Sequence, residues 1–363
     1  MTDEAQALLG TRLGNYALKE IIGRGGMGVV YRASHIYIRK SVAVKVMHRY
    51  LFDQPGAKAR FLTEAQTASL VNHPNIVGVT DFGEAPDGTV YLVMAEAQGV
   101  GLDQVLMEEG TLPLFRTIGI LGQVVRALSA VHAKGIVHRD IKPENIMLDR
   151  RSGTREFVRR VRSGSGHVDR MESEESFDLV TILDFGAARM LQPEAQSEYD
   201  HPRIFGTPAY LAPETAQTGH ADARSEVYTV GILFYEMLTG QVPFEGDSAA
   251  DTLAMHLRRK PQPPRLRNPN VEITDEAERV ILRALDKDPA QRQATMNELW
   301  ADLQRCYGTI TWTRPDMAMG IAFESPLVLP ERKSGKFAVV SPEDATTPPP
   351  ARPFDFGAFA KIR

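Results

Sequence analysis

Cysteine is almost absent from this 363-residue sequence, because Cys306 is its single thiol. One cysteine excludes an intramolecular disulfide and any zinc site built from several thiolates. The sequence has no run of 18 apolar residues, so it predicts no membrane span. Asp3 and Glu4 stand where a secretory signal would be basic, so we expect none. These absences predict a soluble, cytoplasmic protein.

An excess of basic residues is absent too, since 42 Lys and Arg against 46 Asp and Glu give a net charge of -4. Proteins that bind nucleic acid or anionic membranes usually carry a positive excess, so neither partner is expected. The content of 43% hydrophobic and 24% charged residues is typical of a folded globular protein.

Strand-like and helical patterns occupy different parts of the chain. Runs of β-branched and aromatic residues predict strands at 16–22, 29–33, 42–47 and 90–94. Apolar residues at helical spacing predict helices at 58–70 and 117–134. The run 227–238 is apolar nearly all round, which predicts a buried helix, and two more helices are predicted at 276–285 and 296–303. The order predicts an α+β protein with a strand-rich region, 16–96, followed by a larger helical region, 97–304.

Three segments fall outside this pattern. Residues 1–15 are predicted to be a flexible lead. Residues 150–178 combine dense charge with a Ser-Gly-Ser-Gly centre, which predicts a solvated insertion; the rival interpretation is a docking or autophosphorylation element. Residues 305–363 are rich in proline and predicted to be largely disordered, although their aromatic end could dock on a partner.

A glycine cluster, Gly23-Arg24-Gly25-Gly26-Met27-Gly28-Val29-Val30, fits the pattern G-x-G-x-x-G-x-V. Glycines allow backbone N–H groups to approach phosphate oxygens without a Cβ in the way. A dinucleotide-binding fold would need a helix directly after the glycines, whereas a strand-like run follows here. Taken alone, the cluster is best interpreted as an ordinary hairpin.

Lys45 lies in the apolar run Val42-Ala43-Val44-Lys45 of the next predicted strand. A lysine among apolar neighbours needs an anionic partner if it is buried. Glu64, on the helix predicted to follow, is a candidate partner, although alone it would be taken for a surface carboxylate.

Two polar segments follow strand-like runs further along the chain. They are His138-Arg139-Asp140-Ile141-Lys142-Pro143-Glu144-Asn145 and Asp184-Phe185-Gly186. They offer the oxygen ligands and the base that Mg²⁺-assisted phosphoryl transfer requires. Each is short enough to occur by chance, so their order along the chain decides.

The glycine loop, strand lysine, helix glutamate, H-R-D-x-K-x-x-N, D-F-G and Ala212-Pro213-Glu214 occur in the order of the protein-kinase motifs. The sequence resembles the eukaryotic-like (Hanks-type) Ser/Thr protein kinases, and GRGGMGVVYRA is especially similar to bacterial members. The resemblance covers residues 16–303 without the insertion. It implies a bilobal protein kinase fold, with a β-rich N-lobe at 16–96 and a helical C-lobe at 97–304.

The resemblance implies ATP and Mg²⁺ as cofactors. Lys45, paired with Glu64, would hold the α- and β-phosphates, Met94 would be the gatekeeper, and Asn145 and Asp184 would hold Mg²⁺. The implied nucleotide site comprises Ile22, Gly23, Arg24, Gly25, Gly26, Met27, Gly28, Val30, Ala43, Lys45, Met94, Glu96, Ala97, Asn145 and Asp184.

In the same way Asp140 would orient the substrate hydroxyl and accept its proton, and Lys142 would neutralise the transferring phosphate. Lys142 and the stretch from Gly206 to Glu214 are similar to the Ser/Thr type of kinase. The implied function is transfer of the γ-phosphate of ATP to Ser and Thr hydroxyls of protein substrates, and to the chain itself, in bacterial signalling.

Three features depart from the family, of which Ala95, in the hinge where an acid is common, concerns packing more than chemistry. Glu226 stands where the family usually has Asp, a side chain that braces the catalytic loop. The segment between Gly186 and Gly206 has no threonine, so either an acidic side chain replaces the usual phosphate received by Arg139, or Ser197 is phosphorylated. By resemblance, Glu214 would pair with Arg292 as a buried structural bridge.

Two alternatives to an active protein kinase remain. A scaffold that binds partners without transferring phosphate is disfavoured because Lys45, Glu64, Asp140, Asn145 and Asp184 are all present. A small-molecule phosphotransferase of related fold is weakened by the complete glycine loop and the Ala-Pro-Glu segment.

Overall fold

The computed structural model describes residues 2–52, 54, 56–160, 168–184, 189–190 and 207–306, with residues 2–4, 152–160, 168–175 and 189–190 described by their backbone alone. All of these lie in one of the chain's two units, Met1–Pro315. Ser197 and almost all of the predicted tail lie outside the described residues.

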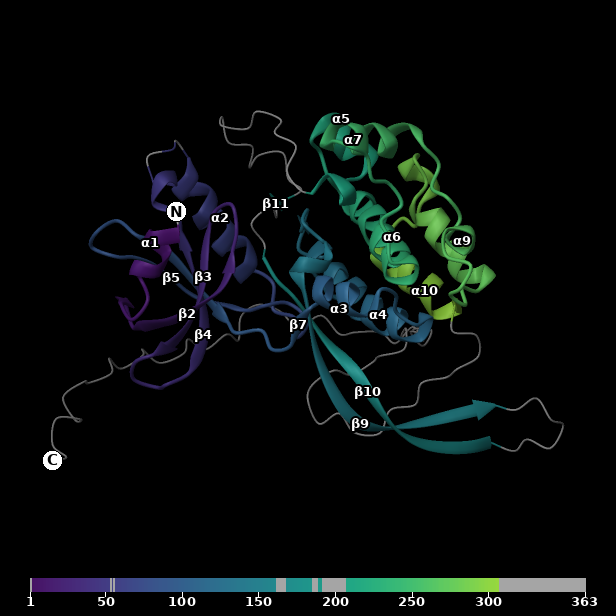
Figure 1. The fold of residues 1–363 in the computed structure, drawn as a ribbon, viewed down its shortest axis with the longest axis horizontal. Coiled ribbons are helices and arrows are strands. Elements are labelled where there is room, and N and C mark those ends of the chain that lie inside the picture. The colour runs from purple at the N-terminus through teal and green to yellow at the C-terminus, as the bar shows by residue number, and fades with distance from the viewer. Residues whose placement is uncertain are drawn as a thin grey trace, which may run out of the picture. The chain divides into compact units, whose positions relative to one another are not determined.

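A six-stranded antiparallel sheet forms the N-lobe (Figure 1). In spatial order its strands are β1 (Arg12–Leu13), β2 (Tyr16–Arg24), β3 (Gly28–His35), β4 (Ser41–Met47), β6 (Val90–Ala95) and β5 (Val79–Glu84). Because side chains alternate along β4, Val44 joins the core cluster on one face of the sheet, whereas Met47 packs with Phe61 of α2 (Ala57–Ser69) on the other. The same alternation places Lys45 on the α2 side.

The lead predicted to be flexible is folded. It contains α1 (Thr2–Ala7) and β1, which pairs with β2. Ala5 is buried in the N-lobe core, and its carbonyl accepts a hydrogen bond of 2.8 Å from the Tyr31 hydroxyl. A helix of six residues is too short to show apolar periodicity, which is why the sequence did not reveal it.

Helices form most of the described C-lobe. They are α3 (Leu102–Glu109), α4 (Leu114–His132), α5 (Pro213–Thr218), α6 (Ala223–Thr239), α7 (Ala249–Arg258), α8 (Pro264–Arg267), α9 (Asp275–Ala284) and α10 (Met296–Cys306). The described C-lobe also has the 3-10 turns η2 (Pro143–Asn145), η4 (Pro208–Tyr210) and η5 (Pro289–Gln291) and the short strands β7 (Val100–Gly101), β8 (Ile136–Val137) and β11 (Arg189–Met190), whereas the turn η1 (Arg49–Leu51) follows β4 in the N-lobe. All of the strands and helices predicted from the sequence are present, with ends shifted by a few residues.

The centre of the C-lobe is built on α4 and α6. Their apolar residues join those of α9 and α10 in the largest core cluster. Among the described helices, α4 is the one long and apolar enough to cross a membrane by length and composition, but most of its apolar residues are buried in this core.

The segment predicted to be a solvated insertion extends a β-hairpin that projects from the C-lobe in Figure 1. Strands β9 (Ile146–Arg160) and β10 (Val168–Ile182) pair in continuous antiparallel register, from Ile146 opposite Ile182 to Arg160 opposite Val168. At its root, Arg116 of α4 donates to both carboxylate oxygens of Asp178, at 2.7 and 3.1 Å. Charge composition does not reveal such a pairing, because the antiparallel ladder is made by backbone N–H and C=O groups.

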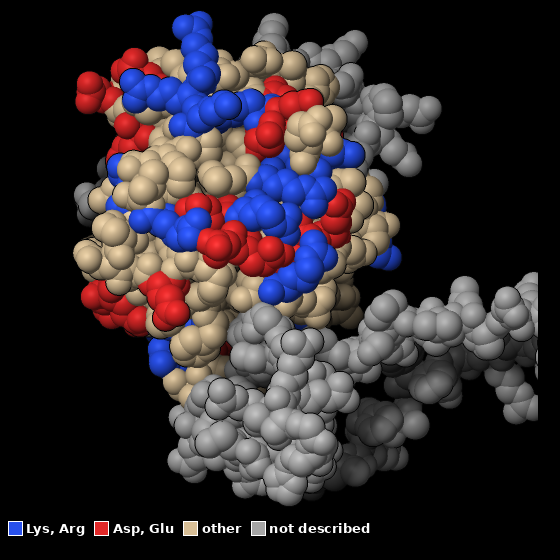
Figure 2. Space-filling view, turned by 90° about the vertical axis from the view of Figure 1, so that its right-hand side faces the viewer, with Lys and Arg blue, Asp and Glu red and all other residues tan. Residues whose placement is uncertain are grey.

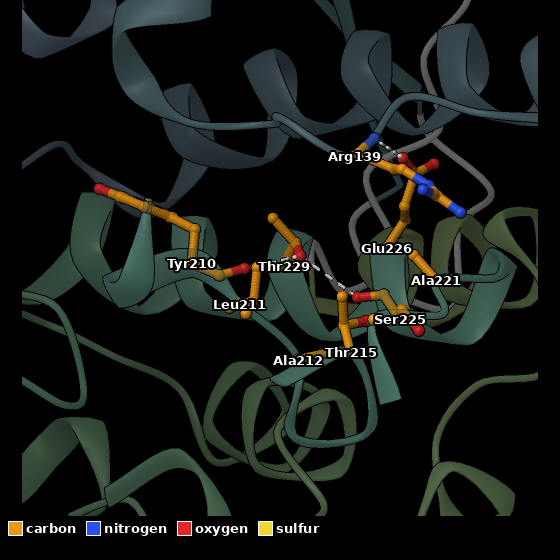
Figure 3. Close-up of a pocket in the computed structure, with 10 residues that line it drawn as sticks. Arg139, Tyr210, Leu211, Ala212, Thr215, Ala221, Ser225, Glu226 and Thr229 are labelled. Carbon is orange, nitrogen blue, oxygen red and sulfur yellow. Dashed lines mark hydrogen bonds between the residues drawn. The ribbon is translucent and has the colours of Figure 1, made fainter. Parts of the chain in front are cut away.

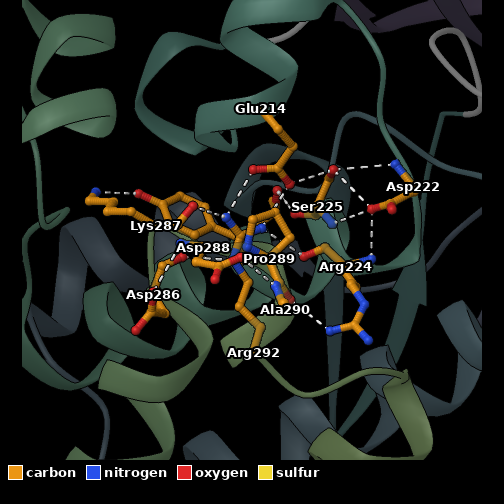
Figure 4. A network of polar contacts seen from close by, with 12 residues as sticks. Glu214, Asp222, Arg224, Ser225, Asp286, Lys287, Asp288, Pro289, Ala290 and Arg292 are labelled. Carbon is orange, nitrogen blue, oxygen red and sulfur yellow. Dashed lines mark hydrogen bonds and ion pairs between the residues drawn. The ribbon is translucent and has the colours of Figure 1, made fainter.

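The bridge implied between Glu214 and Arg292 is present (Figure 4). The guanidinium donates to the two carboxylate oxygens at 2.7 and 2.9 Å, and to the backbone carbonyls of Asp286 and Arg224 at 2.7 and 3.1 Å. The Ser225 hydroxyl donates to the same carboxylate at 2.7 Å. The bridge therefore joins the start of α5 to α6 and to the segment before α10.

Charges of both signs are interspersed on the face at the right-hand side of Figure 1, where α9 lies (Figure 2). Ion pairs of the C-lobe include the exposed pair of Arg279 with Glu276 and the partly buried pair of Arg283 with Glu298, each at 2.5 Å. This face therefore presents no extended field of one sign.

We predict that Arg292→Met destabilises the protein by about 3 kcal/mol, because it leaves the Glu214 carboxylate without its buried partner. This loss of stability is at the low end of the range for breaking a buried ion pair, since the Glu214 side chain is 25% exposed. The measurement is equilibrium unfolding in urea. Arg279→Met, which breaks an exposed pair, is the control and should cost less than about 1 kcal/mol. Equal losses in both variants would contradict the assignment.

Candidate active site

The residues predicted to form the site occupy neighbouring positions in the N-lobe sheet and the first half of the C-lobe. Ile22, Gly23 and Arg24 end β2, Gly25, Gly26 and Met27 form the turn, and Gly28 and Val30 begin β3. Ala43 and Lys45 lie on β4, Met94 lies on β6, and Glu96 and Ala97 follow β6 directly. The register pairs Val30 with Lys45 and Ala43 with Met94, which brings these segments side by side.

The glycines of the cluster have different surroundings. A Cβ on Gly28 would lie 2.1 Å from the carbonyl oxygen of Val46, so packing against β4 requires glycine there. A Cβ on Gly26 would meet nothing within 4 Å, and one on Gly25 would meet only the Gly28 carbonyl, at 3.9 Å. The turn is therefore the part of the cluster that is open to a ligand.

Lys45 connects the two lobes. Its ammonium group lies 2.6 Å from Glu64 Oε1 and 3.1 Å from Asp184 Oδ1, and its side chain is 8% exposed. Burial lowers the pKa of Lys45, but Asp184 and Glu64 together outweigh burial and raise it. Burial raises the pKa of Glu64 to about 7 against the opposing effect of Lys45. The ammonium group thus stays charged, held between the Glu64 side chain of α2 and the Asp184 carboxylate of the C-lobe.

The residues of the predicted catalytic loop form one hydrogen-bonded group. The Asn145 amide nitrogen donates to the Asp140 carbonyl at 2.7 Å and to its carboxylate at 2.8 Å. Lys142 Nζ lies 3.2 Å from the same carboxylate and donates to the Thr207 hydroxyl at 3.1 Å. An amide and an ammonium group therefore fix the Asp140 carboxylate.

Backbone contacts place Asp184 beside this loop. The Leu183 N–H donates to the Asn145 carbonyl at 2.8 Å, and the Leu183 carbonyl lies 3.1 Å from His138 Nε2. Asp184 and Arg139 have φ of 54° and 69°, in the left-handed region that costs a non-glycine residue about 1–3 kcal/mol. Such conformations persist where the surroundings hold them in place.

Glu226 supplies part of that support (Figure 3). Its buried carboxylate accepts the Arg139 N–H at 2.7 Å and lies 2.5 Å from His132 Nε2. Burial raises the pKa of Glu226, but His132, His138 and the Arg139 N–H lower it further, so the net shift is downward. The longer side chain therefore still braces the loop. His132 was missed by the sequence analysis because it lies 94 residues away with no motif to link the pair.

The pocket drawn in Figure 3 is small. Its volume is about 30 Å³, room for a water molecule and too little for a nucleotide. Its lining includes Arg139, Tyr210, Thr215, Ser225, Glu226 and Thr229. It lies beneath the catalytic loop and does not offer a second site for the nucleotide.

The family profile of the protein kinase domain matches residues 16–302. The chain belongs to the protein kinase family. This finding confirms the predicted bilobal α+β fold. A protein kinase domain implies ATP as a substrate and typically a divalent metal ion.

The kinase domain is similar in sequence to bacterial serine/threonine-protein kinases. It is 39% identical to the serine/threonine-protein kinase pkn3 of Myxococcus xanthus over 80% of this chain and 49% of that protein. Identity to the serine/threonine-protein kinase PknB of Mycolicibacterium smegmatis is 36%, over 91% of this chain and 47% of that protein. These matches confirm the predicted family, bacterial Ser/Thr protein kinases. The chain spans about half the length of these relatives.

We predict that Glu226→Gln lowers the free energy of unfolding at pH 7 by about 1.5–3 kcal/mol, the usual contribution of hydrogen bonds to a charged group. Because the folded protein holds the pKa of Glu226 below its ordinary value of 4.5, the carboxylate stabilises the fold above that pH and stops doing so as the pH falls through the lowered pKa. The difference between wild type and variant should therefore shrink in acid.

The measurement is urea unfolding at pH 7 and below pH 4.5. Glu245→Gln, at an exposed position, is the control and should match wild type. A difference that stays constant across this range would contradict the role given to the carboxylate charge.

Proposed function

We propose that this chain is a Mg²⁺·ATP-dependent protein Ser/Thr kinase of the bacterial cytoplasm that phosphorylates protein substrates and itself. The observation that carries the proposal is Lys45, held between Glu64 and Asp184, beside a catalytic loop in which Asp140 is fixed by Lys142 and Asn145. Both lobes contribute to this one arrangement, as phosphoryl transfer between two substrates requires.

In this proposal Lys45 binds the α- and β-phosphates, and Asp184 and Glu64 keep it charged. Val30 and Ala43 cover the adenine, Met94 limits the depth of its pocket, and the backbone of Glu96 and Ala97 meets its edge. The Glu96 side chain accepts a hydrogen bond of 2.5 Å from Nε of Arg32, which lies on β3. That contact supports a backbone role for Glu96, because its carboxylate is already occupied.

In the transfer step Asp140 orients the substrate hydroxyl and accepts its proton as the oxygen bonds to the γ-phosphorus. The bond from that phosphorus to the β-phosphate oxygen breaks, and ADP leaves. Lys142 lies beside Asp140 and neutralises charge on the transferring group. The protein contributes mainly position and charge, as expected for a loose transition state.

The oxygen donors near the loop fit a magnesium ion. The Asn145 amide nitrogen donates both of its hydrogens to Asp140, which leaves its carbonyl oxygen to act as a ligand. The Asp184 side chain is 40% exposed and can offer a carboxylate oxygen. Two protein oxygens suit Mg²⁺, which keeps several waters and binds phosphate. When bound, the ion would neutralise charge on the phosphates.

The choice of Ser and Thr over Tyr rests on the resemblance of Lys142 and of the segment from Thr207 to Glu214. The 3.1 Å contact between Lys142 and the Thr207 hydroxyl supports it, because it ties that segment to the catalytic loop. The role of Ser197 stays a prediction.

We predict that Asp140→Asn lowers γ-phosphate transfer by about 10²- to 10⁴-fold, the usual contribution of a positioned general base. Affinity for ATP should change little. The measurement is incorporation from labelled ATP into the protein and into a basic test protein. Asp87→Asn, an exposed carboxylate in the β5–β6 turn, is the control. Transfer at the wild-type rate by Asp140→Asn would contradict the mechanism.

We also predict that Mg²⁺ increases the thermal stabilisation of the wild-type protein by ATP, and that Asp184→Asn loses most of this increase. The reason is that the substitution removes the carboxylate charge offered to the ion. The measurement is the unfolding temperature with ATP, with and without Mg²⁺. An equal gain from Mg²⁺ in both proteins would rule out Asp184 as a ligand.

A further inference from the structure

Residues that follow β4 reach back to the glycine turn. His48 Nε2 lies 2.9 Å from the Gly25 carbonyl, and the Tyr50 hydroxyl donates to the Gly26 carbonyl at 3.1 Å. The backbone N–H of His48 donates to the Met27 carbonyl at 3.0 Å. Three consecutive carbonyl groups of the turn are therefore bound by one short segment.

The two side chains also support each other. The rings of His48 and Tyr50 stack with their centroids 5.2 Å apart and their planes 23° apart. Because a carbonyl oxygen only accepts hydrogen bonds, Nε2 of His48 must carry the hydrogen in this contact. A hydrogen bond within the turn closes it, since the Gly25 N–H donates to the Gly28 carbonyl at 2.9 Å.

These contacts determine where the turn's N–H groups point. In a trans peptide the C=O and the N–H of the next residue point in opposite directions. Binding the carbonyls of Gly25, Gly26 and Met27 therefore turns the N–H groups of Gly26, Met27 and Gly28 away from His48 and Tyr50. A glycine turn without such contacts would sample many orientations, because glycine has the greatest backbone freedom.

We propose that His48 and Tyr50 are positioning residues that orient the N–H groups of the glycine turn toward the phosphates of the bound nucleotide. The inference rests on the proposed function, since it assigns phosphates to this turn. Neither residue belongs to the glycine motif or to the lysine strand motif. By ordering the turn before ATP arrives, they reduce the entropy that binding would otherwise cost.

The test compares affinities for ATP and for adenosine, measured calorimetrically. Tyr50→Phe keeps the ring and loses the donor, and His48→Leu loses the ring donor. Each should weaken ATP binding about 3-fold and the double variant about 10-fold, as expected for exposed hydrogen bonds. Adenosine, which has no phosphate, should bind all variants as it binds wild type.

Two controls separate positioning from a general structural role. His48→Gln retains a side-chain N–H donor and should restore ATP affinity to near the wild-type value. Tyr37→Phe removes a hydroxyl from a tyrosine that is 76% exposed between β3 and β4, and should change nothing. Unfolding temperatures should be equal among these proteins.

Unchanged ATP affinity in Tyr50→Phe and His48→Leu would overturn the proposal. Equal weakening of ATP and adenosine would also overturn it, because the residues would then support the N-lobe as a whole. If wild type binds neither molecule, the proposed function fails, and the order parameters of the Gly25 and Gly26 amides in the nucleotide-free protein decide the inference. A fall toward about 0.6 in Tyr50→Phe supports the contacts, whereas unchanged values near about 0.85 overturn them.

Discussion

A buried ammonium group connects the parts of this molecule. Lys45 is almost fully enclosed, and a lysine in that position is stable only if carboxylates approach it. One comes from Glu64 of α2 and the other from Asp184, which follows β10 in the C-lobe. Satisfying this one charge therefore fixes the sheet against α2 and the N-lobe against the catalytic loop.

The second carboxylate depends on the scaffold beneath it. Asp184 and Arg139 both have left-handed backbone conformations, which persist only where neighbouring groups hold them. Glu226 and His132 provide such a contact from α6 and α4, the two helices at the centre of the C-lobe core. Hydrophobic packing holds those two helices in place, and Glu226, in contact with His132, holds the loop through its hydrogen bond to Arg139.

The parts of the fold and the site that depend on local sequence patterns could be predicted from the sequence. The apolar run around Lys45, the periodicity of α4, the apolar run of α6 and the order of the motifs were enough to predict both lobes and the family. Prediction failed where partners are distant or segments short: α1 has too few residues for periodicity, and the β9–β10 ladder is a backbone pairing that its charge composition does not reveal. The contacts of His48 and Tyr50 with the glycine turn gave no signal either, because backbone carbonyls carry no sequence identity.

Lys45 already pairs with Glu64 in the structure, so Lys45 does not have to move to form this pair. This arrangement, we propose, transfers phosphate and does not serve only as a binding scaffold. The most direct test offers wild-type protein, first treated with a phosphatase, Mg²⁺·ATP and three peptides that differ only in carrying Ser, Thr or Tyr. We expect immediate phosphorylation of the Ser or Thr peptide and none of the Tyr peptide. ATP binding without transfer to any peptide or to the chain itself would contradict this proposal.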